Sequence, residues 1–365
     1  MPSSDTSAPS ARRPGGGSRI VLVGATGNVG TSLLRRLEDD PAIASITAVA
    51  RRPARSTSEK TAWVAADIGQ DDLVPRFAGA DAVVHLAWAI QPSHDEATMA
   101  RTNLLGSHRV FEAAAAAGVG AIVYASSVGA YSPGPKDRPV DESWPTDGIA
   151  TSFYARHKAT VERMLDRFEE RHPDLRVVRM RPGLIFKRGQ GSEGRRLFLG
   201  PLVPVRFLHP KLLPLLPDVR GVRFQAVHTE DVAEAYHRAV VGDARGPFNL
   251  VADPILDLPT IADAIGARTI PMPASVARAV VELSWRARLQ PTPTGWLDMG
   301  LRSPILSRAR AERELAWTPT RSSTDAVHEV LEGIATRAGE PTPKLEPTID
   351  GHLLERNVGR SDVVR

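Results

Sequence analysis

Tyr154 and Lys158 are the residues whose types and spacing most directly suggest acid–base chemistry. They stand four positions apart near the start of a predicted helix, which places both side chains on one helical face. Free tyrosine has a pKa of about 10, and a neighbouring ammonium group favours the phenolate and lowers that pKa. The pair would therefore donate and accept a proton. The alternative is an ordinary helix face with a buried ring and a lysine that reaches solvent.

Two polar positions that precede this pair belong to elements that would bring them to it. Ser126 and Ser127 follow an apolar run that ends at Ala125, and the carboxyl ends of parallel strands border the ligand crevice of an open α/β sheet. A serine hydroxyl at this edge would bind a substrate oxygen, or simply cap the strand end. Asn103 stands inside a predicted helix, where asparagine is unfavourable. It would either hold a water molecule there or lie exposed on the surface.

A glycine-rich segment, Gly24-Ala-Thr-Gly27-Asn-Val-Gly30, lies between the first predicted strand and the first predicted helix. Glycines in such a turn allow the backbone to approach a pyrophosphate, and the helix N-terminus offers free N–H groups. The spacing is one residue longer than the usual fingerprint, but the flanking elements fit. We therefore predict a dinucleotide site rather than an ordinary strand–helix turn. Its expected cofactor-binding residues are Gly24, Thr26, Gly27, Asn28, Val29 and Gly30.

The residues after the second and third predicted strands indicate which dinucleotide would bind. An acidic residue about 20 positions beyond the glycine turn normally holds the adenosine ribose of NAD. Arg51 and Arg52 occupy this place, and a guanidinium pairs with a 2′-phosphate in a bidentate way. We therefore expect NADP(H) as the preferred cofactor and NAD(H) as the alternative, unless these arginines are only solvated. Asp67 would accept a hydrogen bond from the adenine amino group or cap the following segment.

These residues belong to an alternation of short apolar runs and helix-like segments. Such an alternation predicts βαβ units and a parallel sheet with helices on both faces, the doubly wound α/β (Rossmann) fold. The predicted strands are 20–23, 46–50, 63–66, 82–86, 121–125 and 175–180, and the main predicted helices are 31–38, 99–117 and 152–171.

Beyond residue 186 the alternation ends, and proline and glycine become frequent. We expect a Rossmann domain over 18–186 and a smaller C-terminal substrate lobe over 187–338, from which 222–252 returns to the sheet. The leucine, proline and tryptophan content of this lobe suits an apolar or uncharged small molecule, or simply a packed core. The polar ends, 1–17 and 339–365, are predicted to be a disordered N-terminal tail and a mobile C-terminal tail.

The composition excludes several other classes of protein. The formal net charge of the 365 residues is only +4, and the arginines are spread along the chain, so we expect no nucleic-acid partner. The absence of cysteine excludes disulfides, thiolate metal sites and cysteine nucleophiles. No apolar stretch approaches the roughly 20 residues of a membrane span. The run after Arg12-Arg13 is too short for an export signal, so the expected location is the cytoplasm.

Together, these motifs resemble the short-chain dehydrogenase/reductase superfamily over residues 18–250, and most of all its extended branch, the NAD-dependent epimerase/dehydratase family. The resemblance rests on the glycine turn, Asp67, His85-Leu-Ala87, Asn103, Ser127, Tyr154-x-x-x-Lys158 and Arg181-Pro-Gly183. It implies that Tyr154 is the catalytic acid/base and that Lys158 binds the nicotinamide ribose. It also implies that Ser127 orients the substrate oxygen, that Asn103 completes a proton relay, and that two long helices form a homodimer. Further implied cofactor contacts are Ile68, Leu86, Ala87, Pro182 and Gly183, whereas we interpret His228 and Asp231 as structural.

Departures from the family pattern reduce the number of reactions that the chain could catalyse. Val128-Gly129 follows Ser127 where sugar-nucleotide dehydratases carry an acidic pair, and Phe224 stands where epimerases often carry an arginine for the diphosphate. The first hypothesis is therefore a reductase or dehydrogenase acting on a ketone/alcohol pair of a small organic substrate. One alternative is a sugar epimerase that acts through a keto intermediate. Another is a non-catalytic NADP(H)-binding redox sensor, although sensors of this family have usually lost the tyrosine or the lysine.

Overall fold

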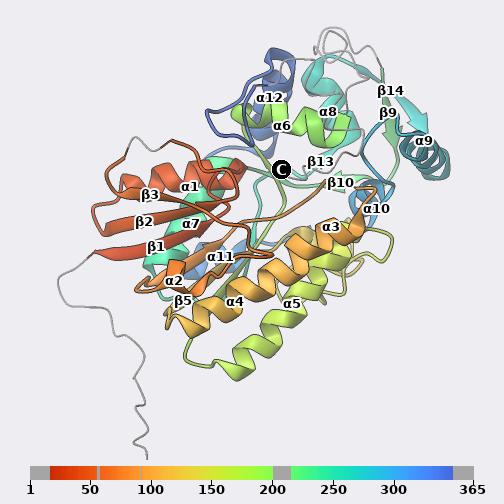
Figure 1. The fold of residues 1–365 in the computed structure, drawn as a ribbon. Helices are drawn as coiled ribbons and strands as arrows, with labels where there is room; N and C mark the ends of the chain where they lie inside the picture. Colours follow the sequence, from red (N-terminus) through yellow and green to blue (C-terminus); the bar gives the residue numbers. More distant parts are fainter. Residues whose placement is uncertain (1–16, 56–57, 92, 200–214, 348–365) are drawn as a thin grey trace, which may run out of the picture.

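The computed structural model describes residues 17–55, 58–91, 93–199 and 215–347 (Figure 1). Among them, seven parallel strands form one sheet in the order β12-β7-β5-β4-β1-β2-β3. The chain builds one half of the sheet from β1 outward and then crosses back to build the other half. This reversal confirms the predicted doubly wound α/β fold, and it occurs between β1 and β4, where such sheets bind ligands. The strands are β1 (Ser18–Val23), β2 (Ile43–Ala50), β3 (Thr61–Ala65), β4 (Ala82–His85), β5 (Ala121–Ala125), β7 (Arg176–Pro182) and β12 (Gly246–Leu250).

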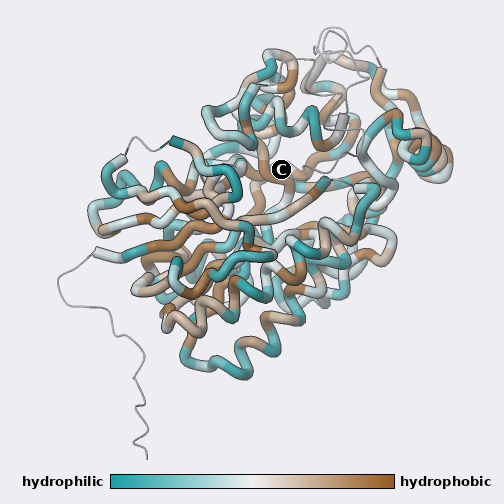
Figure 2. The backbone as a smooth tube through the Cα atoms, viewed as in Figure 1, coloured by the Kyte–Doolittle hydropathy of each residue, from teal (hydrophilic) through white to brown (hydrophobic). Residues whose placement is uncertain are grey.

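Helices cover both faces of this sheet, which is why the central strands β1, β4 and β5 are mostly apolar (Figure 2). On one face, Leu33, Tyr236 and Trp317 fill the layer beneath the helices, and on the other Phe111 and Phe168 do so, all of them at most 1% exposed. The first layer belongs to α1 (Asn28–Glu38), α7 (Thr229–Val241) and α11 (Ala309–Glu314), and the second to α2 (Val74–Phe77), α4 (Ser107–Ala116) and α5 (Phe153–Arg171).

The helix predicted over 99–117 is interrupted. A short helix, α3 (Glu96–Ala100), passes into a π-helical turn, η1 (Arg101–Gly106), before α4 begins. Such turns are rare and often lie at functional sites. Asn103 lies in η1 and is fully buried, so the alternative of surface exposure is wrong.

The remaining elements form a second lobe beyond the carboxyl ends of the sheet (Figure 1). Its strands pair two by two: β6 (Pro139–Val140) with β15 (Ile305–Leu306), β8 (Leu184–Phe186) with β11 (Ala226–His228), β9 (Leu215–Val219) with β14 (Arg268–Met272), and β10 (Arg223–Phe224) with β13 (Leu256–Asp257). Its helices and short turns are η2 (Val128–Ala130), η3 (Arg188–Gln190), α6 (Gly191–Gly194), η4 (Arg195–Leu199), α8 (Leu258–Ile265), α9 (Ala274–Arg286), α10 (Gly295–Arg302) and α12 (Ser323–Thr336). Of the segment 222–252, α7 and β12 return to the sheet as expected, whereas β11 pairs with β8 outside it. None of the described helices has the length and hydrophobicity that crossing a membrane requires.

Residues 339–347 differ from the mobile tail that we expected over 339–365. Leu345 is fully buried, and the Glu340 carboxylate lies 2.7 Å from the Nζ atom of Lys187. We call residues 339–347 the C-terminal strap. The rest of that tail, 348–365, and residues 1–16 of the expected N-terminal tail lie outside the described residues.

Candidate active site

Ser127 and Tyr154 meet at the carboxyl end of the sheet. Ser127 follows β5, and its Oγ atom accepts the N–H of Gly129 at 3.0 Å, while Tyr154 lies in the first turn of α5. Their hydroxyl groups are neighbours, close enough for Ser127 to influence the pKa of Tyr154. Burial raises the pKa of Tyr154, and the Ser127 hydroxyl opposes this rise. The hydroxyl is therefore protonated at neutral pH, and Tyr154 is suited to donate a proton.

Gly129 allows the tyrosine ring to approach the serine turn. A Cβ atom on Gly129 would lie 2.9 Å from Cε1 of Tyr154 and 3.1 Å from Cε of Met299. A larger residue would therefore displace the ring. Gly129, which stands where dehydratases carry an acidic residue, therefore removes a carboxyl group and also makes room for the Tyr154 ring.

Lys158 lies one turn further along α5 and is only 2% exposed. Its Nζ atom donates to the carbonyl oxygen of Ala125 at 2.5 Å and lies 3.5 Å from the centre of the Trp88 ring. Burial lowers the pKa of Lys158 well below its usual value, and the Glu162 carboxylate opposes this shift. We expected the ammonium group to lower the pKa of Tyr154, but the structure contradicts this. The ammonium group faces Ala125 and Trp88, so burial dominates at the tyrosine hydroxyl.

Aromatic side chains from two other segments gather around Tyr154. The Tyr154 ring centre lies 5.0 Å from that of Trp296 and 6.0 Å from that of Trp88. Met299 packs in the same cluster as Tyr154 and Trp296, and we call Trp88, Tyr154, Trp296 and Met299 the aromatic wall. The Nε1 atom of Trp88 is buried without a hydrogen-bond partner among the described residues. Sequence reasoning missed Trp88, although it directly follows the His85-Leu-Ala87 motif that signals this site.

Asn103 holds the loop that carries Trp88. Its side-chain amide accepts the N–H of Ala89 at 2.7 Å and donates to the carbonyl oxygen of Ala89 at 2.8 Å. Its Nδ2 atom also lies 3.4 Å from Nδ1 of the buried His157. The π-helical turn thus brings a buried amide to the backbone beside the aromatic wall. The expected proton relay through Asn103 stays a prediction.

The glycine turn has the backbone geometry that a dinucleotide phosphate requires. Gly24 has a φ of +91°, and a Cβ atom on it would lie 2.7 Å from the backbone nitrogen of Ala87. A Cβ atom on Gly30 would lie 2.4 Å from the carbonyl oxygen of Gly24. No side-chain hydrogen bond caps the N-terminus of α1, so its first N–H groups are suited to an anion. The turn therefore leaves its backbone open to a pyrophosphate and packs against Leu86 and Ala87, whose contacts with a cofactor stay a prediction.

The side chain of Asn28 connects this turn to the second lobe. Its Nδ2 atom donates to Oε1 of Gln190 at 2.9 Å, and its Oδ1 atom accepts from the Thr229 hydroxyl at 3.2 Å. Val29 packs against the core beneath α1. The cofactor contact expected of Asn28 would therefore come from its backbone N–H group.

The other expected cofactor residues lie around the same edge of the sheet. Arg51 and Arg52 are exposed after β2, and Ile68 is buried after β3. Asp67 accepts the N–H of Gly69 at 2.8 Å, so it caps the local turn, and its contact with adenine stays a prediction. Pro182 ends β7, and Gly183 follows it so closely beside β11 that a Cβ atom would lie 2.4 Å from the carbonyl oxygen of Gln225.

The structural interpretation of His228 and Asp231 is confirmed. His228 caps α7 by accepting the N–H of Glu230 at 3.1 Å. Asp231 accepts the hydroxyl of Thr320 at 2.6 Å and the backbone N–H of Arg321 at 3.1 Å.

A buried ion network supports α5, the helix that carries Tyr154 and Lys158, and sequence reasoning missed it. Glu162 is 0% exposed, one turn beyond Lys158, and its oxygens lie 3.1 Å from Arg179 and 2.8 Å from Arg181. Burial opposes its ionisation, but hydrogen bonds and the two guanidinium charges lower the pKa of Glu162 to about 2. The same carboxylate accepts the hydroxyl of Ser126 at 2.5 Å. Ser126 is therefore bound to Glu162, which leaves its neighbour Ser127 to meet Tyr154.

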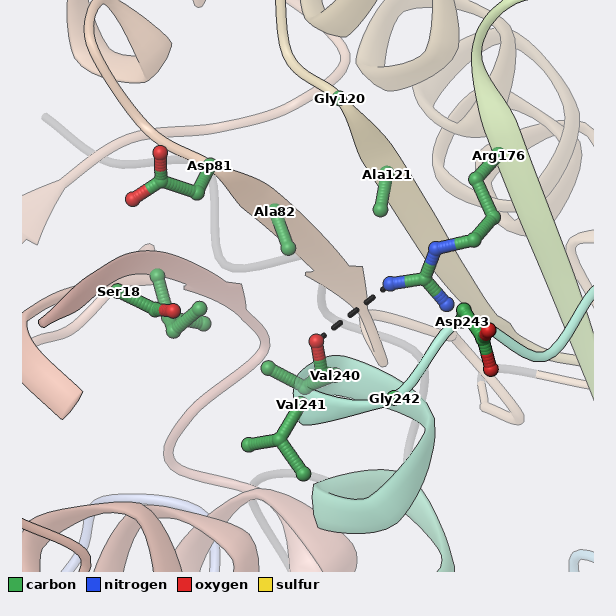
Figure 3. A pocket seen from close by; sticks show the side chains of 11 residues that line it. Ser18, Asp81, Ala82, Gly120, Ala121, Arg176, Val240, Val241, Gly242 and Asp243 are labelled. Atoms are coloured by element: carbon green, nitrogen blue, oxygen red, sulfur yellow. Dashed lines mark hydrogen bonds between the residues drawn. The ribbon is translucent and has the colours of Figure 1, made fainter. Parts of the chain in front are cut away.

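A separate cavity of about 440 Å³ lies at the opposite, amino-terminal edge of the sheet (Figure 3). Arg176 donates there to the carbonyl oxygens of Ala239 and Ala244, at 2.8 and 3.0 Å, and thereby binds the C-terminal end of α7. We assign no chemistry to this cavity, because Tyr154 and Lys158 lie at the carboxyl edge. Its lining residues are Ser18, Ile20, Asp81, Ala82, Gly120, Ala121, Arg176, Val240, Val241, Gly242 and Asp243.

Comparisons with known proteins identify the family of this chain. The model of the NAD dependent epimerase/dehydratase family matches residues 20–250. Uncharacterized protein Rv0501 of Mycobacterium tuberculosis is 26% identical over 94% of this chain and 89% of its own length. UDP-glucose 4-epimerase of Mycolicibacterium smegmatis is 26% identical over 86% of this chain and 97% of its own length.

Solved structures share the fold at low sequence identity. The crystal structure of gox2253 superposes with a TM-score of 0.66 at 22% identity and covers 87% of this chain and 98% of its own. MoeE5 in complex with UDP-glucuronic acid and NAD gives a TM-score of 0.66 at 21% identity, with the same coverage of 87% and 98%.

Proposed function

Since the chain belongs to the NAD dependent epimerase/dehydratase family, we propose that it is an NAD(P)-dependent oxidoreductase that reduces a ketone on a small, largely apolar substrate. The observation that carries this proposal is the placement of the Ser127 and Tyr154 hydroxyl groups as neighbours, with Lys158 one helical turn away. With its hydroxyl group protonated at neutral pH, Tyr154 is suited to donate a proton to a ketone oxygen.

The proposed reaction divides its work between the cofactor and three side chains. The nicotinamide would supply a hydride to the carbonyl carbon. Ser127 donates a hydrogen bond to the carbonyl oxygen, and Tyr154 transfers its proton to the same oxygen, so that the ketone becomes an alcohol. Lys158 binds the nicotinamide ribose and, when protonated, favours the phenolate that Tyr154 becomes.

The cofactor would lie along the carboxyl edge of the sheet. The N–H groups after Gly27 would bind the pyrophosphate, and Arg51 and Arg52 would bind a 2′-phosphate. Both arginines are exposed at the end of β2, which supports access of such a phosphate. We therefore include a preference for NADP(H) in the proposal.

The aromatic wall supports an apolar substrate. Trp88 and Trp296 flank the Tyr154 ring with indole faces and edges, which suit flat or apolar groups better than a diphosphate. Arg223, the arginine adjacent to the position where epimerases hold a diphosphate, donates instead to the carbonyl oxygen of Lys136 at 2.6 Å. This contact argues against its use for a nucleotide sugar.

A second candidate function is epimerisation of a nucleotide sugar. It is favoured by the likeness to UDP-glucose 4-epimerase over most of both chains. Epimerisation would use the same tyrosine and serine with a cofactor that is regenerated in each cycle. Net consumption of NAD(P)H therefore separates the two candidates.

The decisive experiment compares the wild type with Tyr154→Phe and Tyr124→Phe. A panel of aromatic and aliphatic ketones is assayed for NADPH and NADH oxidation, and UDP-glucose and UDP-galactose are assayed for interconversion. We expect ketone-dependent NADPH oxidation whose kcat falls by about 10²–10⁴-fold in Tyr154→Phe. Tyr124→Phe is the control, because the hydroxyl of Tyr124 is buried without a hydrogen-bond partner among the described residues.

Three other outcomes would contradict the proposed ketone reduction. Equal turnover of Tyr154→Phe and the wild type would exclude the proposed mechanism. Interconversion of UDP-sugars without net cofactor consumption would establish the second candidate instead. Nucleotide binding without any turnover would point to a sensor.

A further inference from the structure

We propose that Lys344, on the C-terminal strap, is a ligand of the cofactor pyrophosphate, and that the strap fastens the dinucleotide onto the glycine turn. This inference rests on the proposed use of a dinucleotide. The family match ends at residue 250, so the strap lies outside the part of the chain that the family describes.

The strap lies directly on the glycine turn. The hydroxyl of Thr342 donates to the carbonyl oxygen of Thr26 at 2.9 Å. A Cβ atom on Gly27 would lie 3.7 Å from Nζ of Lys344. Gly27 is the residue that precedes α1, at whose N-terminus the pyrophosphate is expected. The structure therefore places an ammonium group beside the residue that precedes the expected phosphate site.

Several contacts hold the strap in this place. Leu345, next to Lys344, is fully buried. The Glu340 carboxylate lies 2.7 Å from Nζ of Lys187 and 3.2 Å from a guanidinium nitrogen of Arg35 on α1. Arg196 donates to the carbonyl oxygen of Glu346 at 3.2 Å. The strap is thus bound to α1 and to the second lobe, on both sides of the residue that we assign.

The strap leaves free the backbone N–H groups that would bind the phosphate. Thr342 uses a carbonyl oxygen of the turn, and the N-terminus of α1 has no side-chain cap. The positive end of the helix dipole and the Lys344 ammonium group would therefore act on the same anion.

An ion pair positions Lys344. Its Nζ atom lies 3.3 Å from Oε1 of Glu193, whose side chain is 6% exposed, whereas that of Lys344 is 47% exposed. An ammonium group carries three donors, so it can keep its contact with Glu193 while donating to a phosphate. Glu193 would then hold the lysine in place, and the exposed part of the ammonium group would meet the cofactor.

Binding titrations test this assignment independently of turnover. The dissociation constants of NADPH, NADH and ADP-ribose are measured for the wild type, Lys344→Met, Lys344→Arg and the control Glu346→Gln. We expect Lys344→Met to weaken all three ligands by about tenfold, as for the loss of one charge-assisted hydrogen bond. Lys344→Arg should stay within about threefold of the wild type, since it keeps the charge. Lys344→Met should also weaken the dependence of binding on salt, which a merely structural loosening would leave unchanged.

The outcomes separate this inference from the proposed function. If the wild type binds none of these ligands, the proposed use of a dinucleotide fails. If the wild type binds them and Lys344→Met binds equally well, the proposed function stands and the role of Lys344 is excluded. A loss confined to NADPH and NADH, with ADP-ribose unaffected, would also overturn it, because ADP-ribose retains the pyrophosphate.

Discussion

The Nζ atom of Lys158 lies 3.5 Å from the centre of the Trp88 ring. When the Lys158 amine is protonated, it is attracted at this distance over an indole by about 0.5–2 kcal/mol, with the larger values in desolvated sites. Trp88 therefore has two roles in the proposed site. It holds the ammonium group against the carbonyl oxygen of Ala125, and its ring forms one side of the aromatic wall.

Replacing Trp88 should change substrate preference more than it changes the chemistry. We expect Trp88→Ala to raise KM for an aromatic ketone by about tenfold, because the substrate loses an indole surface worth roughly 1 kcal/mol or more. KM for a small aliphatic ketone should change less, and Trp88→Phe should lie between. Steady-state kinetics measure this, with Trp63→Phe on β3 as the control. Equal changes in KM for both kinds of ketone would contradict the assignment of the wall to the substrate.

The protonation of Tyr154 should make the two directions of the reaction respond oppositely to pH. Burial raises its pKa, so the hydroxyl stays protonated through neutral pH and beyond about pH 10. Reduction, which needs the protonated form, should be constant across neutral pH. Oxidation of the product alcohol needs the phenolate and should still be rising at the alkaline end of the profile.

Ser127 provides the internal check on this pH dependence. The Ser127 hydroxyl lowers the pKa of Tyr154, so Ser127→Ala should move the oxidation limb to still higher pH. The measurement is kcat against pH in both directions, with enzyme stability checked at each pH. An oxidation limb centred near pH 7 in the wild type would show that the tyrosine is not controlled by burial.

The cofactor preference should depend on the residues that end β2. We expect the double variant Arg51→Glu, Arg52→Glu to weaken NADPH by about tenfold or more and to leave NADH within about threefold, because the added carboxylates repel the 2′-phosphate. Fluorescence titration gives both dissociation constants. Arg55→Glu is the matched control, since Arg55 is also exposed in the same loop. An unchanged ratio of the two constants would mean that these arginines only contact solvent.

The sequence was sufficient to predict the fold and the central pair, because both depend on local patterns. Apolar runs that alternate with amphipathic segments define the sheet, and the end of a strand and the start of a helix place Ser127 and Tyr154. Trp296 and Lys344 reach the site from segments more than 140 residues beyond Tyr154. No periodicity encodes which loop packs against which turn, so these contacts could not be predicted.

The direction of the Tyr154 pKa shift could not be predicted from the sequence either. The i,i+4 spacing predicts that Lys158 lies near Tyr154, and this holds, since its Nζ atom is 5.8 Å from the ring centre. The spacing does not reveal that the ammonium group faces Trp88, or how deeply the hydroxyl is buried. The sign of the shift depends on these two facts.

Glu162 should contribute strongly to stability, because it is the shared counterion of two buried arginines. Its oxygens contact Arg179 at 3.1 Å and Arg181 at 2.8 Å, and both arginines are less than 8% exposed. Removing one partner of a buried ion pair typically costs about 3–5 kcal/mol, since the remaining charge is left unpaired. We expect Glu162→Gln to lower the free energy of unfolding by about this amount. The control Glu169→Gln removes a partner of Arg179 that is 34% exposed, and it should cost only about 0–1 kcal/mol.

The pH dependence of unfolding tests whether the ionised form of Glu162 stabilises the fold. The pKa of Glu162 is about 2 in the folded protein, below its ordinary value of 4.5. The unfolded chain therefore binds this proton first, so the contribution of Glu162 is fully present above about pH 4.5 and is lost as the pH falls toward 2. Urea unfolding of the wild type and Glu162→Gln, followed by circular dichroism between pH 7 and 3, should show two stability curves that converge as the pH falls. Parallel curves would mean that the ionised carboxylate does not supply the stability, and that the loss in Glu162→Gln comes from packing alone.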